Sequence, residues 1–169
     1  MLVLRGWAAG GMRMGPIAAL IALVASLLPM GCAIQLVSNY DEVTDKGVTA
    51  LHRDVEAFFL TLKEELAERP ADALHAKHKG FYSKARLDLG TLRLRADSIP
   101  KNTQTVEQLK LLDASLADLE RLHLLHDQAV RDNTTTNRLS PAIVDITRQL
   151  FHTHLSSILA LEMAKKRGG

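Results

Sequence analysis

Histidines are the residues of this chain whose type and spacing could support chemistry. The chain has seven, and four of them form two pairs with three-residue spacing, His75/His78 and His123/His126. Residues three apart share one face of a helix, so each pair can present two imidazoles to a neighbouring helix. Imidazole binds zinc, copper and nickel, and helical bundles hold metals between facing helices. The spacing therefore predicts a candidate Zn or Cu site at these four residues.

Two other interpretations of the histidines compete with this site. Glu120 precedes His123 in a Glu-x-x-His step of the di-iron type, but di-iron bundles need a second step and further glutamates, which nearly excludes them. The favoured interpretation is that half-buried rings form hydrogen bonds at the margins of a bundle. At about 1.5 Å of rise per residue, both pairs lie at similar heights, near the polar loop 132–137. The same estimate places His52 and His154 together, lower down.

The remaining polar residues lack the context that catalysis requires. No serine lies in a nucleophile-elbow motif, and no glycine-rich loop is suited to phosphate. Acidic residues such as Glu64, Glu65, Asp113 and Asp118 fall on or beside polar helix faces, where solvated charge is the usual explanation. The sequence therefore predicts that the protein is not an enzyme.

The only cysteine, Cys32, follows an apolar N-terminal segment. Arg5 and Arg13 precede an Ala- and Leu-rich run that ends at Gly31, beside the cysteine. A basic start, a short apolar middle and a small-residue exit are the layout of a secretory signal peptide. The pattern predicts export, with residues 1–31 acting as the signal.

More narrowly, this segment resembles the lipobox signal of bacterial lipoprotein precursors. The residues that carry the resemblance are Leu28, Gly31, Cys32 and Ala33. Pro29 departs from the pattern, because it stands where a lipobox usually has leucine. The resemblance implies that Cys32 carries fatty acyl chains such as palmitate and anchors the mature protein to the lipid bilayer. Ala33 stands where lipoproteins retained in the inner membrane have Asp, which implies an outer-membrane location with the domain in the periplasm.

Two alternatives for the N-terminal segment stay open. Residues 16–37 are long enough, at about 1.5 Å per residue, to cross a hydrocarbon core about 30 Å thick as an uncleaved anchor. An ordinary buried helix with a core cysteine is the third interpretation, and the Pro and Gly content disfavours it. A single thiol in an oxidising compartment is a liability unless something consumes it. Lipidation of Cys32 consumes it.

Charge and composition exclude nucleic acid as a partner and favour helices. The chain has 21 basic and 19 acidic residues, and Arg5 and Arg13 leave with the signal, so the mature part is close to neutral. Nucleic-acid binding needs a clustered basic field. The one basic cluster, 165–167, is expected to neutralise a helix end. Aromatic residues make up only 4% of the chain, and its leucine-rich composition suits helices.

Four amphipathic segments must position the histidines. Helices are expected at 41–68, 72–98 and 103–131 and from Ser140 onward. Asp41 and Ser140 are suitable N-caps, and Pro141 suits the first helical position. The fourth helix is expected to bury Ile143, Ile146, Leu150, Ile158 and Leu161. Short connections between long helices predict an all-α, antiparallel four-helix bundle with up-down-up-down topology.

Together these patterns predict a signal at 1–31, a lipidated Cys32 with an extended tether at 32–40, and a bundle at 41–169. The leading hypothesis is a non-catalytic lipoprotein that faces the periplasm and binds another envelope protein or has a structural role there. The alternative hypothesis is a metal-binding or metal-sensing bundle that uses the two histidine pairs. A purely structural envelope protein without a specific partner is the third.

Overall fold

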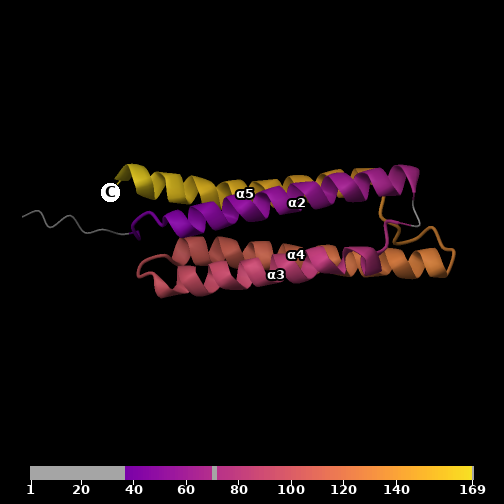
Figure 1. Cartoon of the computed structure of the whole chain (residues 1–169), viewed down its shortest axis with the longest axis horizontal. Coiled ribbons are helices and arrows are strands. Elements are labelled where there is room, and N and C mark those ends of the chain that lie inside the picture. Colours follow the sequence, from indigo (N-terminus) through magenta and orange to yellow (C-terminus); the bar gives the residue numbers. More distant parts are fainter. Residues whose placement is uncertain (1–36, 70–71, 169) are drawn as a thin grey trace, which may run out of the picture. The chain divides into compact units, whose positions relative to one another are not determined.

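The four amphipathic segments are helices with nearly the expected bounds. The computed structural model describes residues 37–69 and 72–168. Its helices are α2 (Glu42–Glu68), α3 (His75–Ser98), α4 (Thr103–Arg131) and α5 (Pro141–Gly168). Consecutive helices run antiparallel and α5 packs against α2, which confirms the all-α, up-down-up-down four-helix bundle (Figure 1). Cys32 and the signal segment 1–31 lie outside the described residues.

The bundle has two poles, which we call proximal and distal. The proximal pole holds residues 37–41, the turn between α3 and α4, and the C-terminal end of α5 (Figure 1). The distal pole holds the α2–α3 and α4–α5 connections. At a rise of about 1.5 Å per residue, helices of 24 to 29 residues separate the poles by roughly 40 Å.

Side-chain caps set the starts of α2 and α5, as the sequence predicts. The Asp41 carboxylate accepts hydrogen bonds from the backbone N–H of Thr44 at 3.1 Å and from its hydroxyl at 2.6 Å. The same carboxylate receives two 2.6 Å hydrogen bonds from the Arg95 guanidinium, which hold the pKa of Asp41 well below its usual range. The Ser140 hydroxyl accepts the backbone N–H of Ile143 at 3.3 Å.

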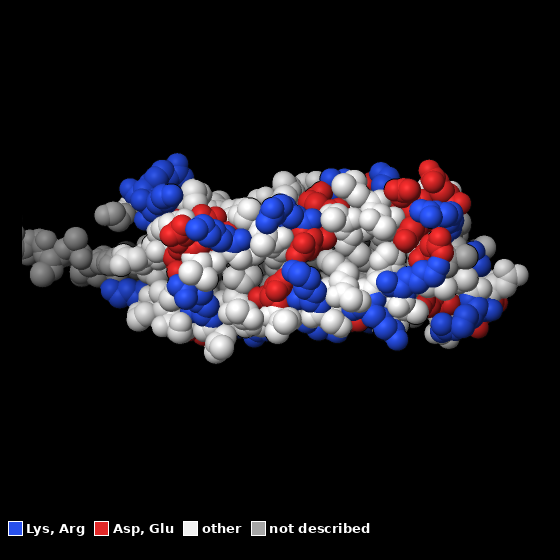
Figure 2. Space-filling model, in the orientation of Figure 1, with Lys and Arg blue, Asp and Glu red and all other residues white. Residues whose placement is uncertain are grey.

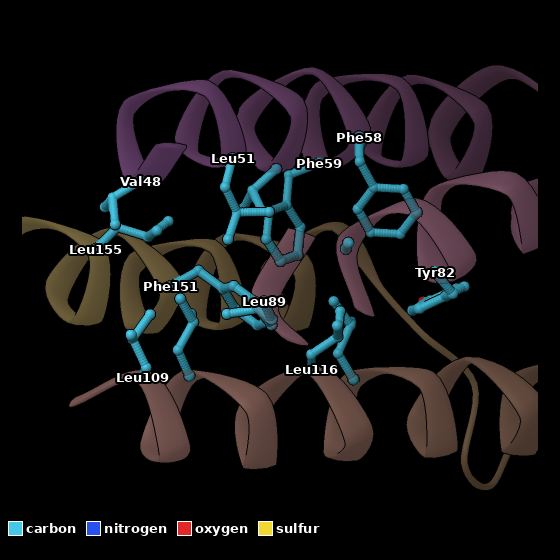
Figure 3. Packing of buried hydrophobic residues seen from close by; sticks show 14 of the residues in the cluster. Val48, Leu51, Phe58, Phe59, Tyr82, Leu89, Leu109, Leu116, Phe151 and Leu155 are labelled. Carbon is cyan, nitrogen blue, oxygen red and sulfur yellow. The ribbon is translucent and has the colours of Figure 1, made fainter. Parts of the chain in front are cut away.

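A leucine-rich core fills the space between the helices (Figure 3). Each helix contributes large buried side chains, among them Leu51, Phe59, Leu89, Leu116 and Phe151. The rings of Phe59 and Phe151 meet edge-on with centroids 5.4 Å apart, which joins α2 to α5. Full burial of a side chain of this size contributes roughly 1.5–3 kcal/mol. These positions therefore hold the four helices together.

The buried face of α5 differs from the expected one. The prediction that Ile143, Ile146 and Leu150 are buried is wrong, because their side chains are 39%, 72% and 46% exposed. Ile158 is buried as expected, and Leu161 is half-buried. The other apolar residues on the core side of α5 are Val144, Phe151 and Leu155. The helix carries two apolar stripes about 100° apart around its axis. The stripe that contains Val144, Phe151 and Leu155 faces the core, and the stripe that contains Ile143, Ile146 and Leu150 is exposed.

Buried polar residues complete the core side of α5 at the proximal pole. The side chains of Lys165 and Glu162 are only 4% and 0% exposed, although Lys165 lies in the last turn of α5 with the other basic residues expected to neutralise that helix end. Its ammonium donates to Glu162 Oε1 at 2.5 Å, Asn102 Oδ1 at 2.6 Å and Thr105 Oγ1 at 2.8 Å. Glu162 Oε2 accepts the backbone N–H of Asp41 at 3.1 Å. We call these five residues the polar node.

Candidate functional site

The four histidines predicted as a metal site come together at the distal pole. His75 and His78 lie at the start of α3, and His123 and His126 lie near the end of α4. Ring centroids are 5.7 Å apart for His75 and His123, 5.4 Å for His78 and His123, and 6.3 Å for His123 and His126. The heights estimated from the sequence placed the two pairs at the same level of the bundle. The structure has the rings of His75, His78 and His126 next to that of His123.

Both ring nitrogens of His123 are hydrogen-bonded inside the protein. Nε2 lies 3.0 Å from the carbonyl oxygen of Ala73, which only accepts, so Nε2 carries the proton. Nδ1 lies 2.9 Å from the Tyr82 hydroxyl and therefore accepts that O–H. Burial lowers the pKa of His123 from 6.5 to about 4, which keeps the ring neutral at pH 7. His123 is a core histidine with a fixed tautomer whose lone pair is already engaged.

Carboxylates hold the two histidines of α3. Nε2 of His75 lies 2.9 Å from Glu120 Oε1, and Nε2 of His78 lies 2.7 Å from Glu65 Oε2. Their side chains are 9% and 11% exposed. The hydrogen bonds are of the kind favoured from the sequence, but the rings are more deeply buried than the half-buried position expected at the bundle margin. A metal held by all four histidines would have to displace these bonds, and its binding there stays a prediction.

Sequence reasoning missed Asp127, which organises the distal pole. Its buried carboxylate accepts the backbone N–H of His75 at 2.9 Å, and so caps α3 from α4 in place of Leu74, whose side chain has no capping oxygen. Beside it, Nδ1 of His126 accepts the backbone N–H of Leu139 at 3.0 Å. The first bond joins the start of α3 to α4, and the second joins the α4–α5 connection to α4. Hydrophobic periodicity carries no signal for either of them.

A second histidine cluster lies between α2 and α5. The sequence pairs His52 with His154, whereas the structure places His152 against His52, with ring centroids 5.6 Å apart. His52, Glu56 and His152 each bring one ligand atom to within 4.8 Å of the others. They line an open groove of about 470 Å³. The difference follows from the rotation of α5, because its core side lies about 100° from the expected one.

Comparison with protein-family models, with curated proteins and with solved structures finds no match to this chain. Across residues 37–69 and 72–168, no helix combines the length and the apolar character that crossing a membrane requires. The surfaces and side chains of the bundle are therefore the basis for a functional proposal.

The outer face of α3, opposite its core side, exposes two leucines among small residues. Leu87 and Leu94 are 70% and 75% exposed on this face. The residues of the face follow one another at alternating spacings of four and three, and they are Ala76, Gly80, Ser83, Leu87, Gly90 and Leu94. Such heptad spacing is typical of one helix packing along another. We call these six residues the α3 stripe.

Two glycines of the α3 stripe have no packing role within the described chain. A Cβ added at Gly80 or Gly90 would meet no atom of the described residues within 4 Å. At Gly47 of α2, in contrast, an added Cβ would lie 2.7 Å from Leu92 Cδ2, so glycine there permits close packing of α2 on α3. Each glycine in a helix interior is about 1 kcal/mol less favourable than alanine. Gly80 and Gly90 thus weaken α3 with no gain in internal packing.

Basic side chains flank the α3 stripe on both edges. Lys77 and Lys84 follow one edge, and Lys79, Arg86 and Arg93 follow the other. These are the flanking heptad positions, where charge sets the choice of partner helix. All but Lys79 pair with acidic residues of the bundle, but exposed ion pairs contribute only about 0–1 kcal/mol and exchange readily. Figure 2, seen from the side of α2 and α3, shows uncharged surface between the charged side chains of this face.

Proposed function

We propose that this protein is a membrane-tethered, non-catalytic adaptor that binds an amphipathic helix of another envelope protein along the α3 stripe. The exposure of Leu87 and Leu94 is the observation that carries this proposal. Exposed apolar patches rimmed by polar residues mark protein–protein interaction sites. The glycines between the leucines allow a second backbone to approach closely. The stripe therefore has the shape and chemistry of a helix-docking surface.

The charges that flank the α3 stripe define the partner. Five basic residues and no acidic ones occupy the flanking positions on α3. A partner helix with acidic flanks would pair with them, which favours encounter and fixes the register. A second copy of this chain would bring basic edges against basic edges. The partner is therefore a different protein whose docking helix is apolar along one seam and acidic beside it.

The location of the adaptor follows from its resemblance to lipoprotein precursors. Transfer of a diacylglyceryl group, with acyl chains such as palmitate, to the Cys32 thiol through a thioether bond and cleavage before Cys32 would fix the protein to a bilayer. More than one acyl chain is needed for stable anchoring. Ala33 supports the outer membrane as the destination, with the bundle in the periplasm. The partner would then be a periplasmic or envelope protein within reach of the tether.

In-cell cross-linking of the full-length protein tests this proposal. A photoreactive residue at Ser83 lies on the α3 stripe and is exposed. We expect one product, cross-linked at a helix with acidic flanks. Leu87→Asp should reduce this product roughly tenfold to hundredfold, since a buried leucine contributes about 1.5–3 kcal/mol. Ile146→Asp is the matched control, because Ile146 is 72% exposed on a different helix and should leave the yield unchanged.

A second variant separates binding from stability. Gly90→Ala adds a methyl group to open space and should stabilise α3 by up to about 1 kcal/mol, which raises the Tm. On the docked surface the same methyl obstructs the partner backbone, so the cross-linked yield should fall. Equal losses from Leu87→Asp and Ile146→Asp, a product that consists of two copies of this chain, or no product at all would contradict the adaptor proposal.

A further inference from the structure

We propose that His52, Glu56 and His152 bind one Zn²⁺ ion between α2 and α5, with a fourth coordination position open to the groove. His52 and Glu56 lie one turn apart on α2, and His152 faces them from α5. This cluster is separate from the α3 stripe and from the distal histidines. Zinc bound here would join the two helices whose packing closes the bundle.

The distances suit a small divalent ion. One ligand atom from each of His52, Glu56 and His152 lies within 4.8 Å of the other two. Tetrahedral zinc with bonds of about 2.0–2.2 Å holds its ligand atoms roughly 3.4 Å apart. Small side-chain rotations are therefore enough to bring the three atoms into coordination.

An unpartnered nitrogen marks the centre of the cluster. Nε2 of His52 is buried, yet it has no hydrogen-bond partner among the described residues. Its distance to Glu56 Oε1 is 3.9 Å, too long for a hydrogen bond. A buried polar atom without a partner is destabilising, and native structures normally supply one from protein, water or an ion. A metal between His52 and Glu56 would supply it.

Arg148 orients the carboxylate ligand. Its Nε donates to Glu56 Oε2 at 2.8 Å, and its Nη2 lies 2.5 Å from the same oxygen in an ion pair. Both contacts are with Oε2, and Oε1 is the oxygen nearer His52, at 3.9 Å from its Nε2. Carboxylates that bind metals are typically held by such an outer hydrogen bond. The guanidinium charge also limits affinity, so we expect weaker binding than in sites whose carboxylate has no cationic neighbour.

The donor set favours zinc and leaves one position free. Two imidazoles and one carboxylate are the ligands of zinc sites that keep an open position for water or another ligand. Asp145 also lines the groove, where Lys63 donates to both its oxygens at 2.8 and 2.7 Å, and Asp145 is not part of the group whose ligand atoms lie within 4.8 Å of one another. The open side of the site faces the groove of about 470 Å³. Water or a carboxylate from a partner would fit there.

Zinc titration of the full-length, detergent-solubilised protein tests the site. After removal of metals with a chelator, calorimetry should show one Zn²⁺ bound per chain, and zinc should raise the Tm. His152→Ala should weaken binding at least tenfold and abolish the Tm increase. His152 is exposed, so its removal should leave the fold intact, as circular dichroism would verify. Glu56→Gln, which keeps the shape but removes the charge, should weaken binding in the same way.

Two control variants locate the bound ion. His154→Ala removes the neighbouring imidazole on α5, and His78→Ala removes one from the distal pole. Both should bind zinc as the wild type does. Absence of zinc binding by the wild type overturns the proposal. Undiminished binding by His152→Ala, or equal losses in His152→Ala and His154→Ala, overturns it as well, because zinc would then bind elsewhere or without selectivity.

Discussion

Acidification tests the buried, neutral state of His123 most directly. Above pH 6.5 the ring is neutral in both the folded and the unfolded chain. Between pH 6.5 and about 4 the unfolded chain binds a proton at this ring that the folded chain excludes, because burial lowers its folded pKa to about 4. The free energy of unfolding therefore falls as the pH falls through this window, and below it His123 causes no further loss.

The magnitude follows from the size of the pKa shift. One pKa unit corresponds to about 1.4 kcal/mol, so a shift from 6.5 to about 4 removes about 3 kcal/mol of stability between pH 7 and pH 4. A small domain has about 5–15 kcal/mol in total. Burial also lowers the pKa values of His75 and His126, and these act in the same direction. A variant at His123 is needed to isolate its share.

Urea unfolding of the full-length wild type and of His123→Leu, followed by circular dichroism across this pH range, measures that share. At pH 7 the variant should be less stable, since it leaves the Tyr82 hydroxyl and the Ala73 carbonyl without their partner at about 1–3 kcal/mol each. The difference should shrink by about 3 kcal/mol at pH 4. Histidine side-chain NMR of the wild type should show an Nε2–H tautomer that stays neutral to about pH 4. Parallel pH curves for the two proteins, or a wild type that gains stability on acidification, would refute the reasoning.

Three further predictions concern stability. Asp41→Ala should lower the free energy of unfolding by about 1–2 kcal/mol through loss of the α2 cap, as urea titration would show; an unchanged midpoint would contradict the capping role. Lys165→Met should cost about 3–5 kcal/mol by leaving Glu162 buried without its cation, and the double variant Lys165→Met/Glu162→Leu should recover most of it. A double variant no more stable than the single one would argue against this charge effect. Gly47→Ala should change the Tm by only a few degrees, because a gain of about 1 kcal/mol in helix propensity opposes the displacement of Leu92 Cδ2, a terminal methyl that the new Cβ would meet at 2.7 Å; a fall in Tm of more than about 8 °C in a thermal scan would mean that Leu92 cannot move aside.

Local sequence signals were sufficient to locate the helices. Asp41, Ser140 and Pro141 mark helix starts with side-chain chemistry that acts within one turn, and the structure has the helices begin there. Apolar residues three and four apart gave the rest of each helix, and short connections gave the antiparallel order. These signals are local, which is why they could be read without knowledge of the packing.

The rotation of α5 could not be read in the same way. Two apolar stripes compete on this helix, and the one that contains Ile146 is the more hydrophobic in its first half. The choice of the other stripe places Glu162 and Lys165 in the core, where only partners from other helices make their burial acceptable. A hydrophobic pattern counts such residues against burial. The same error of rotation paired His52 with His154 in place of His152.

The candidate sites also combine features that the sequence predicts with features that only the packed structure shows. Spacing and helix height were sufficient to gather the distal histidines near His123. The bonds that decide their chemistry come from elsewhere in the chain, from the Ala73 carbonyl in a connection and from the Tyr82 hydroxyl. The α3 stripe was not predicted from the sequence, because only the exposure of Leu87 and Leu94 in the structure identifies it. Only the packed structure shows that Gly80 and Gly90 face open space.

The polar node has a mechanical consequence for a chain held at a membrane by its N-terminal end. Tension on such a chain reaches the described part of the bundle at Val37. Ser38 passes the load to the start of α4 through its 2.9 Å bond to Asn102, and Asp41 passes it to the end of α5 through Glu162. The force is then distributed over α2, α4 and α5 and acts along their axes. It does not act on α2 alone, which would unfold that helix one turn at a time. In the tethered, partner-bound protein that we propose, this arrangement would resist unzipping of the bundle under tension.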